Sequence, residues 1–197
     1  MVTVMNNLII LGAGGHGEVC AEIAELSGKY NKIFFLDDDT SKKQCLKYNV
    51  IGTFEDYIKY KNDDFFVAIG DNKLRKKYIE RLNKPLDILI HPNAIISQSC
   101  TIQEGTVIMP GVVINANTHI GKGCIINTSV SVDHDCSIGD YVHLSPGVHL
   151  GGTCEIGDFT WVGIGSIIVN NITVNENEMI KAGTVIKRSL KKDRRLL

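Results

Sequence analysis

This sequence lacks an excess of either charge, since it has 21 Lys and Arg residues against 22 Asp and Glu residues. Proteins that bind nucleic acid usually carry a strongly basic surface, so we expect no nucleic-acid partner. No apolar run approaches the roughly 18–20 residues that span a bilayer, and we expect no membrane association. The opening MVTVMNNLIILGAGG lacks the charged and apolar regions of a signal peptide. Together these absences predict a cytoplasmic chain.

Cysteine pairs of the kind that bind metals or perform redox chemistry are also missing. The six cysteines form no CxxC motif, and a reducing cytosol argues against a disulfide framework. We therefore expect neither disulfides nor a metal site. Hydrophobic residues make up 44% and charged residues 22% of the 197 residues. This is the composition of an ordinary soluble protein, long enough for one or two domains with cores of their own.

Residues 1–90 have the pattern of a small α/β domain. The expected strands are LIIL (8–11), KIFFL (32–36), FFVAIG (65–70) and DILI (87–90), and the expected helices are HGEVCAEIAELSG (16–28) and LRKKYIERLN (74–83), with a shorter helical pattern at FEDYIKY (54–60) after an irregular stretch. Strands that alternate with helices in this way favour a parallel sheet, and continuous apolar strands are typical of sheets buried on both faces. We predict a small Rossmann-like sheet.

Residues 91–197 are dominated by a six-residue repeat. Ile, Val or Leu recurs at sixteen successive positions from Ile96 to Ile186, without an insertion. A small or β-branched residue follows most of these positions four residues later. Four cysteines occupy this second slot, and we interpret them as small buried hydrophobic residues rather than metal ligands: Cys100, Cys124, Cys136 and Cys154. Glu178 is the clear departure from the rule.

A six-residue period suits a short strand followed by a turn, with one large aliphatic side chain pointing inward each time. Three such units make an 18-residue triangular coil, and coils stack at the ordinary strand spacing of about 4.8 Å. The pattern resembles the left-handed parallel β-helix of the hexapeptide-repeat acyltransferases. The left hand comes from that resemblance, because the general crossover rule favours the opposite hand.

The segment VDHDC (132–136) is the candidate reactive site of the repeat. Val132 and Cys136 take inward positions, so Asp133, His134 and Asp135 are expected to face outward at a corner. One coil later the position of His134 is Gly152, which predicts open space beside the imidazole ring. A carboxylate beside a histidine can fix its tautomer and stabilise the imidazolium, which suits a general base. The alternative is an exposed histidine in a turn formed by the aspartates.

The segment LIILGAGGHG (8–17) places Gly12, Gly14 and Gly17 in GxGxxG spacing between a strand and a helix. Such glycines expose backbone N–H groups at the start of a helix, which suits a diphosphate. An acidic cluster after the second strand, Asp37 to Asp39, lies near the position expected for a ribose. The domain is short for a full dinucleotide fold, so a nucleotide attached to another group fits better than NAD. Gly70, Asp71 and Asn72 follow the third strand, either as a helix cap alone or as ligand contacts.

Taken together, GAGGHG, AIGDN, HPNA and VDHD resemble one bacterial family across nearly the whole chain. This is the family of nucleotide-sugar and sialic acid acetyltransferases, which includes the UDP-4-amino-sugar N-acetyltransferases of bacillosamine synthesis. The resemblance implies a homotrimer whose acetyl-CoA lies in a cleft between adjacent β-helices. It also implies that the α/β domain holds the nucleotide of a nucleotide-sugar substrate.

The resemblance assigns a role to each candidate residue. His134 is the catalytic base and Asp135 its orienting partner, although the sequence alone leaves Asp133 as an alternative. The candidates for the nucleotide sugar are Gly12, Gly14, His16, Asp37, Asp38, Gly70 and Asn72. The candidates for acetyl-CoA are His143, Gly152, Gly163 and Gly165. The basic tail KRSLKKDRRLL (187–197) either meets CoA phosphates or is a solvated end.

The predicted reaction is acetyl transfer to the 4-amino group of a UDP-4-amino-4,6-dideoxy sugar, by direct attack with His134 as base. Transfer to a GDP-linked sugar such as GDP-perosamine and O-acetylation of a sialic acid are alternatives with the same motifs. A non-catalytic trimer that binds nucleotide sugars is an alternative of a different class.

Overall fold

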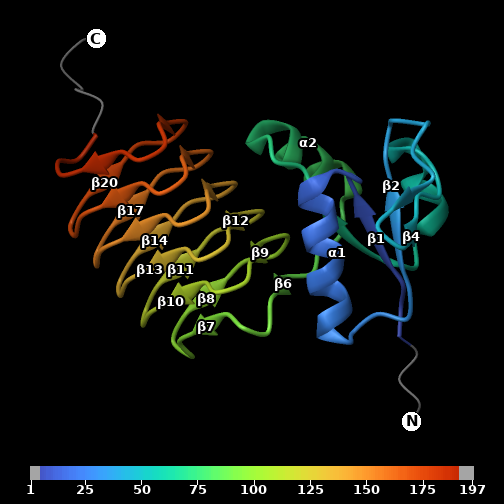
Figure 1. Ribbon diagram of the computed structural model, residues 1–197, viewed down its shortest axis with the longest axis horizontal. Coiled ribbons are helices and arrows are strands. Elements are labelled where there is room, and N and C mark those ends of the chain that lie inside the picture. Colours follow the sequence, from blue (N-terminus) through green and yellow to red (C-terminus); the bar gives the residue numbers. More distant parts are fainter. Residues whose placement is uncertain (1–4, 191–197) are drawn as a thin grey trace.

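A computed structural model describes residues 5–190 of the chain. Figure 1 shows a small α/β domain beside a stack of triangular coils that runs on to the C-terminal end. Residues 191–197, which hold most of the basic tail, lie outside the described part. Neither α-helix within residues 5–190 is long and apolar enough to cross a membrane.

The N-terminal domain has a parallel three-stranded sheet in the order β2-β1-β5. Its elements are β1 (Leu8–Leu11), α1 (Gly15–Ser27), β2 (Ile33–Leu36), the 3₁₀ helix η1 (Phe54–Tyr60), β5 (Asp64–Val67) and α2 (Asn72–Leu82). All four residues of β1 are buried, as expected for the central strand of a sheet covered on both faces. The expected strands and helices of this region are confirmed, with one exception at the end of the domain.

The exception is the segment DILI, which we expected to continue the N-terminal sheet. Its residues Leu89–Ile90 form β6, which pairs in parallel with Val107–Ile108 of the β-helix. The physical reason is the repeat itself, because Ile90 stands one six-residue step before Ile96 and therefore keeps the coil register. A second difference lies in the stretch expected to be irregular, which contains the hairpin of β3 (Gln44–Cys45) and β4 (Tyr48–Asn49).

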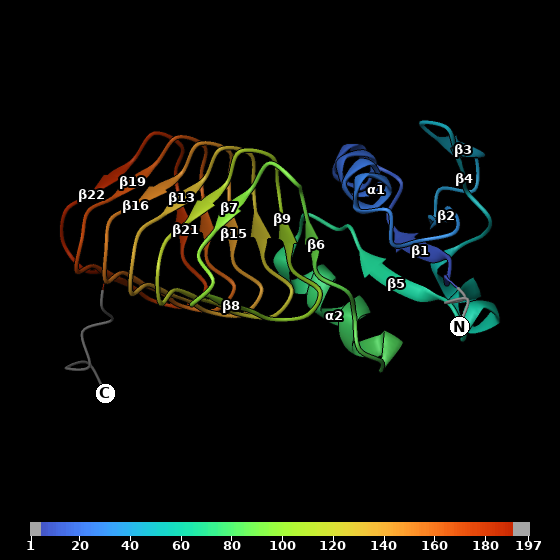
Figure 2. The same cartoon turned by 90° about the horizontal axis from the view of Figure 1, so that it is seen from below.

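The β-helix consists of three parallel sheets, and Figure 2 shows it from the side, with its axis across the picture. Sheet 1 contains β7 (Ile95–Ile96), β10 (Val113–Ile114), β13 (Ser131–Val132), β16 (His149–Leu150), β19 (Ile167–Ile168) and β22 (Val185–Ile186). Sheet 2 contains β8 (Thr101–Ile102), β11 (His119–Ile120), β14 (Ser137–Ile138), β17 (Glu155–Ile156) and β20 (Thr173–Val174). Sheet 3 contains β6, β9 (Val107–Ile108), β12 (Ile125–Ile126), β15 (His143–Leu144), β18 (Trp161–Val162) and β21 (Met179–Ile180).

The aliphatic residue of each repeat points into the core, as the sequence predicts. Every one of these positions from Ile108 to Ile186 is buried, while Ile96 and Ile102 in the first coil are half-buried. Each strand pairs with the strand 18 residues away, for example Val113 with Ser131. Neighbouring coils therefore bury each other's aliphatic side chains, which is the source of stability in solenoids.

The second slot of the repeat has a role beyond packing. The Thr118 hydroxyl donates to the Asp133 carbonyl at 2.8 Å and accepts from the backbone N–H of Cys136 at 3.2 Å. One coil on, Cys136 Sγ repeats both contacts, to the Gly151 carbonyl at 3.3 Å and from the N–H of Cys154 at 3.4 Å. The buried cysteines therefore also link successive coils by hydrogen bonds, which explains why Thr and Ser share their slot.

Candidate active site

His134 lies at the corner between β13 and β14, where the chain passes from sheet 1 to sheet 2. Its Nδ1 lies 2.8 Å from Asp135 Oδ2, and both side chains are about half exposed. Asp135 has a positive φ of 57°, which turns its carboxylate back toward the preceding ring. An ionised carboxylate only accepts hydrogen bonds, so the imidazole carries its proton on Nδ1 and leaves Nε2 free to accept.

The two aspartates act on the histidine in different ways. Asp133 accepts from the backbone N–H of His134 at 2.9 Å and from Asn115 at 3.0 Å, and does not bond the ring. The pKa of His134 is raised above its usual value, first by the hydrogen bond to Asp135 and second by the charge of Asp133. The pKa of each aspartate is lowered in turn. The geometry thus favours Asp135 as the orienting partner.

The sequence suggested open space beside the His134 ring at Gly152, but the structure shows the ring lying against this glycine. A Cβ atom placed on Gly152 would lie 2.7 Å from both Cε1 and Nε2 of His134. The imidazole ring itself therefore occupies the space above the glycine. Any larger residue at 152 would push the ring away, because Cβ atoms do not approach other atoms so closely.

The two other glycines predicted for acetyl-CoA have local structural explanations. A Cβ on Gly163 would lie 2.5 Å from the backbone nitrogen of Ala182 in the next coil. Gly165 occupies a corner position with a φ of 66°, and nothing lies within 4 Å of the Cβ it lacks. Gly163 allows the coils to stack, whereas Gly165 combines a left-handed turn with open space.

The glycine-rich turn of the α/β domain has a closed side and an open side. A Cβ on Gly12 would lie 2.7 Å from the Ala68 carbonyl oxygen, and one on Gly17 would lie 2.0 Å from the Gly12 carbonyl oxygen. Gly14 and Gly70, by contrast, have nothing within 4 Å of the Cβ position. Helix α1 begins after Gly14 without a side-chain cap. Its first N–H groups therefore remain available to an anion at the open side.

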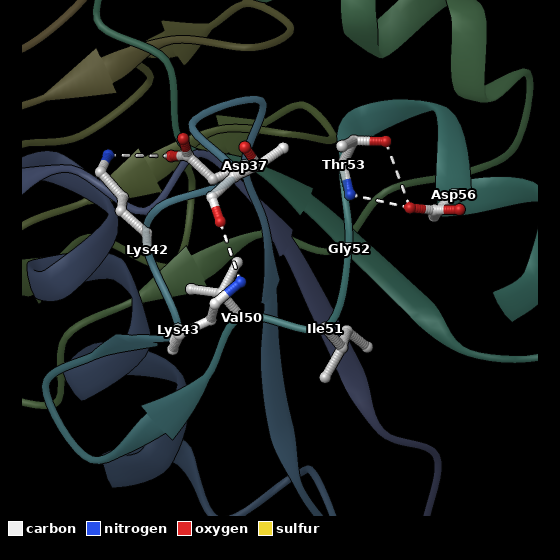
Figure 3. Close-up of a pocket in the computed structure, with 9 residues that line it drawn as sticks. Asp37, Lys42, Lys43, Val50, Ile51, Gly52, Thr53 and Asp56 are labelled. Atoms are coloured by element: carbon white, nitrogen blue, oxygen red, sulfur yellow. Dashed lines mark hydrogen bonds and ion pairs between the residues drawn. The ribbon is translucent and has the colours of Figure 1, made fainter.

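Asp37 and Asp38 hold the loops around this turn. Asp37 Oδ2 accepts from the N–H of Ala13 at 2.7 Å and from Lys42 Nζ at 3.2 Å, and Asp38 Oδ1 accepts from the N–H of Phe54 at 2.9 Å. Figure 3 shows Asp37 and Lys42 at one side of a pocket, with Thr53 and Asp56 at the other. The pocket has a volume of about 310 Å³ and lies beside the end of β2, on the side where nucleosides bind in related sheets.

The outward side chains of sheet 3 are covered by the α/β domain in the first coils and become exposed in the last. Along the sheet, Leu89 is 2% exposed, His143 is 8% exposed and Met179 is 66% exposed. Helix α1 packs on β6 at the covered end. The single tryptophan, Trp161, stands at the boundary and stacks on the His143 ring with a centroid distance of 4.6 Å.

His143 is a neutral, buried histidine. Asn127 Oδ1 accepts from the N–H of Thr128 at 2.8 Å, so the Asn127 amide nitrogen donates to His143 Nε2 at 3.2 Å. The imidazole proton is then on Nδ1, which is buried and has no partner among the described residues. Burial lowers the pKa of His143 to about 3, with a further contribution from Arg75. The pKa of the half-buried His16 is lowered to about 4 for the same two reasons.

Two residues of this region, Arg75 and Trp161, were not predicted from the sequence as part of the site. Arg75 is 0% exposed, although it lies in an expected helix with three other Lys and Arg residues and nothing in that sequence marks it as buried. Trp161 occupies an outward position that the repeat leaves unconstrained. The sequence does hold a signal that the outer face of sheet 3 is covered. The outward residues of its first three coils are Leu89, Val107 and Ile125. Three aliphatic residues at 18-residue spacing on an outer face indicate that something packs there.

The structure does not bring all the predicted site residues together in one chain. His134 lies at the corner of sheets 1 and 2, which is opposite sheet 3 in a triangular prism. The α/β domain, with Gly14 and His16, packs against sheet 3 and holds the predicted nucleotide-sugar residues. No group of three or more His, Cys, Asp or Glu side chains suited to a metal ion occurs within residues 5–190.

Comparison with known proteins places the chain among acetyltransferases. Residues 7–82 match the PglD N-terminal domain and residues 117–152 match the bacterial transferase hexapeptide of six repeats. The structure superposes on the acetyltransferase domain of PglB from Neisseria gonorrhoeae FA1090 with a TM-score of 0.91 and 37% identity, over 95% of this chain and 94% of that chain. The chain belongs to the hexapeptide-repeat sugar N-acetyltransferases.

Two further members of this family share its fold or sequence. PerB from Caulobacter crescentus, solved in complex with CoA and GDP-perosamine, matches with a TM-score of 0.89 and 33% identity over 95% of this chain and 91% of that chain. UDP-N-acetylbacillosamine N-acetyltransferase of Bacillus subtilis (strain 168) is 37% identical over 112 residues, which are 53% of this chain and 52% of that protein. The sequence match thus spans about half the length of this curated relative.

Proposed function

We propose that the protein transfers the acetyl group of acetyl-CoA to the 4-amino group of a nucleotide-linked 4-amino-4,6-dideoxy sugar, with UDP as the first choice of nucleotide. The observation that carries this proposal is the 2.8 Å contact between His134 Nδ1 and Asp135 Oδ2 on an exposed corner of the β-helix. The Neisseria gonorrhoeae domain has also been solved with acetyl coenzyme A, which supports the donor.

The reaction at His134 follows from its tautomer. The neutral amine attacks the thioester carbonyl carbon, and a C–N bond forms while His134 Nε2 accepts the amine proton. The imidazolium is stabilised by the Asp135 carboxylate, whose hydrogen bond already raises the pKa of the histidine. The C–S bond then breaks, and the thiolate of CoA leaves with the proton that His134 returns. No covalent enzyme intermediate is needed, because the cysteines near His134 lie in the core.

We place the nucleotide sugar at the open side of the glycine-rich turn, at the start of α1. The uncapped N–H groups after Gly14 can bind the diphosphate, and the pocket at Asp37 and Lys42 can take the nucleoside. The sequence assigned His143 to acetyl-CoA, but we reassign it to the nucleotide sugar because it lies under the α/β domain. Its buried Nδ1–H has no partner among the described residues and would gain one from a substrate oxygen that reaches it. Its pKa of about 3 keeps it neutral at physiological pH.

A second copy of the chain completes the site, as the predicted homotrimer requires. In one chain His134 lies at the corner opposite sheet 3, whereas the glycine-rich turn belongs to the domain that packs on sheet 3, so one subunit supplies the base and a neighbour presents the sugar. Sheet 1 offers a surface for such packing, because Ile95, Ile167 and Val185 on its outer face are 68%, 42% and 49% exposed. An apolar face of this kind is typical of subunit contacts.

The test is release of free CoA thiol from acetyl-CoA in the presence of UDP- and GDP-linked 4-amino sugars. We expect turnover with a UDP-linked amino sugar, and PerB makes the GDP-linked sugar the main competitor. Nucleotide binding without thiol release from any amino sugar would favour the non-catalytic alternative. Sedimentation of the protein as a monomer at assay concentrations would contradict the shared site.

A further inference from the structure

Arg75 is a buried cation whose hydrogen-bonding capacity is fully used within the chain. Its Nε donates to the Gly123 carbonyl at 2.7 Å, and its Nη1 donates to the carbonyls of Ile69 at 2.9 Å and Gly70 at 3.0 Å. Its Nη2 donates to Asn72 Oδ1 at 2.8 Å and to the Tyr141 carbonyl at 3.0 Å. All five guanidinium N–H groups are therefore satisfied, and none of these bonds goes to a carboxylate.

These bonds join the two domains at a repeated feature of the β-helix. Gly123, Tyr141 and Phe159 occupy the same corner in three successive coils. Arg75 donates hydrogen bonds to the carbonyls of the first two, and the Asn72 amide nitrogen donates to the Phe159 carbonyl at 2.9 Å. The first turn of α2 thus holds three stacked corners. A carbonyl stack at 18-residue spacing is a rigid partner, because each coil fixes the position of the next.

The segments that Arg75 connects lead to residues proposed for the nucleotide sugar on both domains. Tyr141 leads into β15 with His143, and Phe159 leads into β18 with Trp161. On the other side, Ile69 and Gly70 follow Ala68, whose carbonyl oxygen lies against the turn at Gly12. Gly70 and Gly14 each have nothing within 4 Å of the Cβ position. One side chain therefore sets the distance between the glycine-rich turn and the coil that carries His143.

A purely structural contact would not require an arginine at this place. Burial of a cation without an acidic partner is unfavourable, and burial lowers the pKa of Arg75 to about 10. An apolar residue would avoid that cost but would leave the Gly123 and Tyr141 carbonyls without this donor. The planar guanidinium, however, can bond two domains at once in a fixed geometry, which an apolar side chain or a lysine cannot do.

We propose that Arg75 is a positioning residue for the nucleotide-sugar half of the site. With Asn72, it locks the α/β domain on the β-helix and so fixes the glycine-rich turn relative to the coils that carry His143 and Trp161. This inference rests on the proposed function. Arg75 acts through the segments it holds and does not contact the substrate. The acetyl-CoA half at His134 depends on the β-helix alone and should not respond to Arg75.

The test compares Arg75→Met and Arg75→Lys with Arg81→Met, a control on the same helix whose arginine is exposed and pairs with Glu55. We expect Arg75→Met to raise the KM for the nucleotide sugar and the Kd for UDP or GDP by about ten-fold or more. The KM for acetyl-CoA should stay within about two-fold of wild type, because removing one group of contacts affects only the ligand that uses them. Arg75→Lys should restore less than half of the lost affinity, and Arg81→Met should change nothing.

Parallel changes in both KM values, or no change in either, would overturn the role of Arg75. If Arg75→Met does not fold, Asn72→Leu removes the Phe159 contact and one Arg75 acceptor. Because Asn72 is buried and its amide bonds within the chain, this variant also tests positioning, and it should raise the nucleotide-sugar KM alone. UDP and GDP binding by calorimetry needs no turnover. Wild-type protein that binds nucleotide but transfers no acetyl group would therefore contradict the proposed function and leave the Arg75 test intact.

Discussion

His134 and His143 lie nine residues apart on one β-helix and experience opposite surroundings. His134 is exposed at a corner, and its pKa is raised by Asp135 and Asp133. His143 is 8% exposed under the α/β domain, and burial lowers its pKa to about 3. The repeat that creates both positions is the same. What differs is whether the N-terminal domain covers the sheet, so covering one face of a regular solenoid gives its histidines different chemistry.

Replacing His134, the proposed base, should have the largest effect on this contrast between the two histidines. His134→Asn should reduce kcat by about 10²- to 10⁴-fold, the usual contribution of a general base. Thiol release at saturating substrates measures this. His119→Asn provides a matched control, since His119 is also an exposed histidine of the β-helix and bonds only Thr101. Equal activity of both variants would remove the assignment of the base.

Gly152, against which the His134 ring lies, should have the next largest effect on kcat when it is replaced. Gly152→Ala places a methyl group 2.7 Å from two atoms of the His134 ring, so the ring must move. Misplacing a catalytic group by an ångström can reduce the rate about 100-fold. We expect kcat to fall while the melting temperature changes little, because the corner is exposed. Thermal unfolding and thiol release on the same sample separate the two effects. An unchanged kcat would mean that the ring orientation seen here is not the productive one.

Replacing the two aspartates should shift the pH dependence of kcat/KM by different amounts. Asp135 is the largest cause of the raised pKa of His134, so Asp135→Ala should move the acid limb of the kcat/KM profile to lower pH. The weaker base should also lower the plateau rate by about ten-fold. Asp133→Ala should shift the limb in the same direction by less, since Asp133 acts only through its charge. Rate profiles from pH 5 to about 9 test the order, and a larger shift for Asp133→Ala would reverse it.

The last prediction concerns protonation of the wild-type histidines, and it expects two of the three rings not to titrate. The imidazole signals of His134 should titrate with a midpoint above about 6.5, the ordinary value for histidine. Those of His143 and His16 should remain those of neutral rings down to pH 5, because their pKa values are about 3 and about 4. Proton–nitrogen spectra of histidine-labelled protein measure all three. A His143 ring that protonates near pH 6 would show that sheet 3 is solvated in solution.

Much of the fold could be predicted because its rules are local. The six-residue spacing of aliphatic residues places Val132 and Cys136 inside and Asp133 to Asp135 outside, whatever surrounds the coil. The same holds for Gly12 and Gly17, whose missing Cβ atoms are required by the turn. The segment DILI was misassigned because apolarity marks a strand without naming the sheet that receives it. Arg75 was missed because a basic residue in a basic helix gives no sign of burial.

The sequence by itself determined the β-helix, the glycine-rich turn and the outward position of His134, because each follows from a short-range pattern with one physical solution. Only the tertiary structure decided which aspartate bonds the imidazole, that Gly152 lies against the ring, and that His143 is buried while His134 is not. It also decided that Arg75 and Asn72 join the two domains. These features depend on how segments distant in the chain pack together, and packing is set by contacts that no local pattern contains.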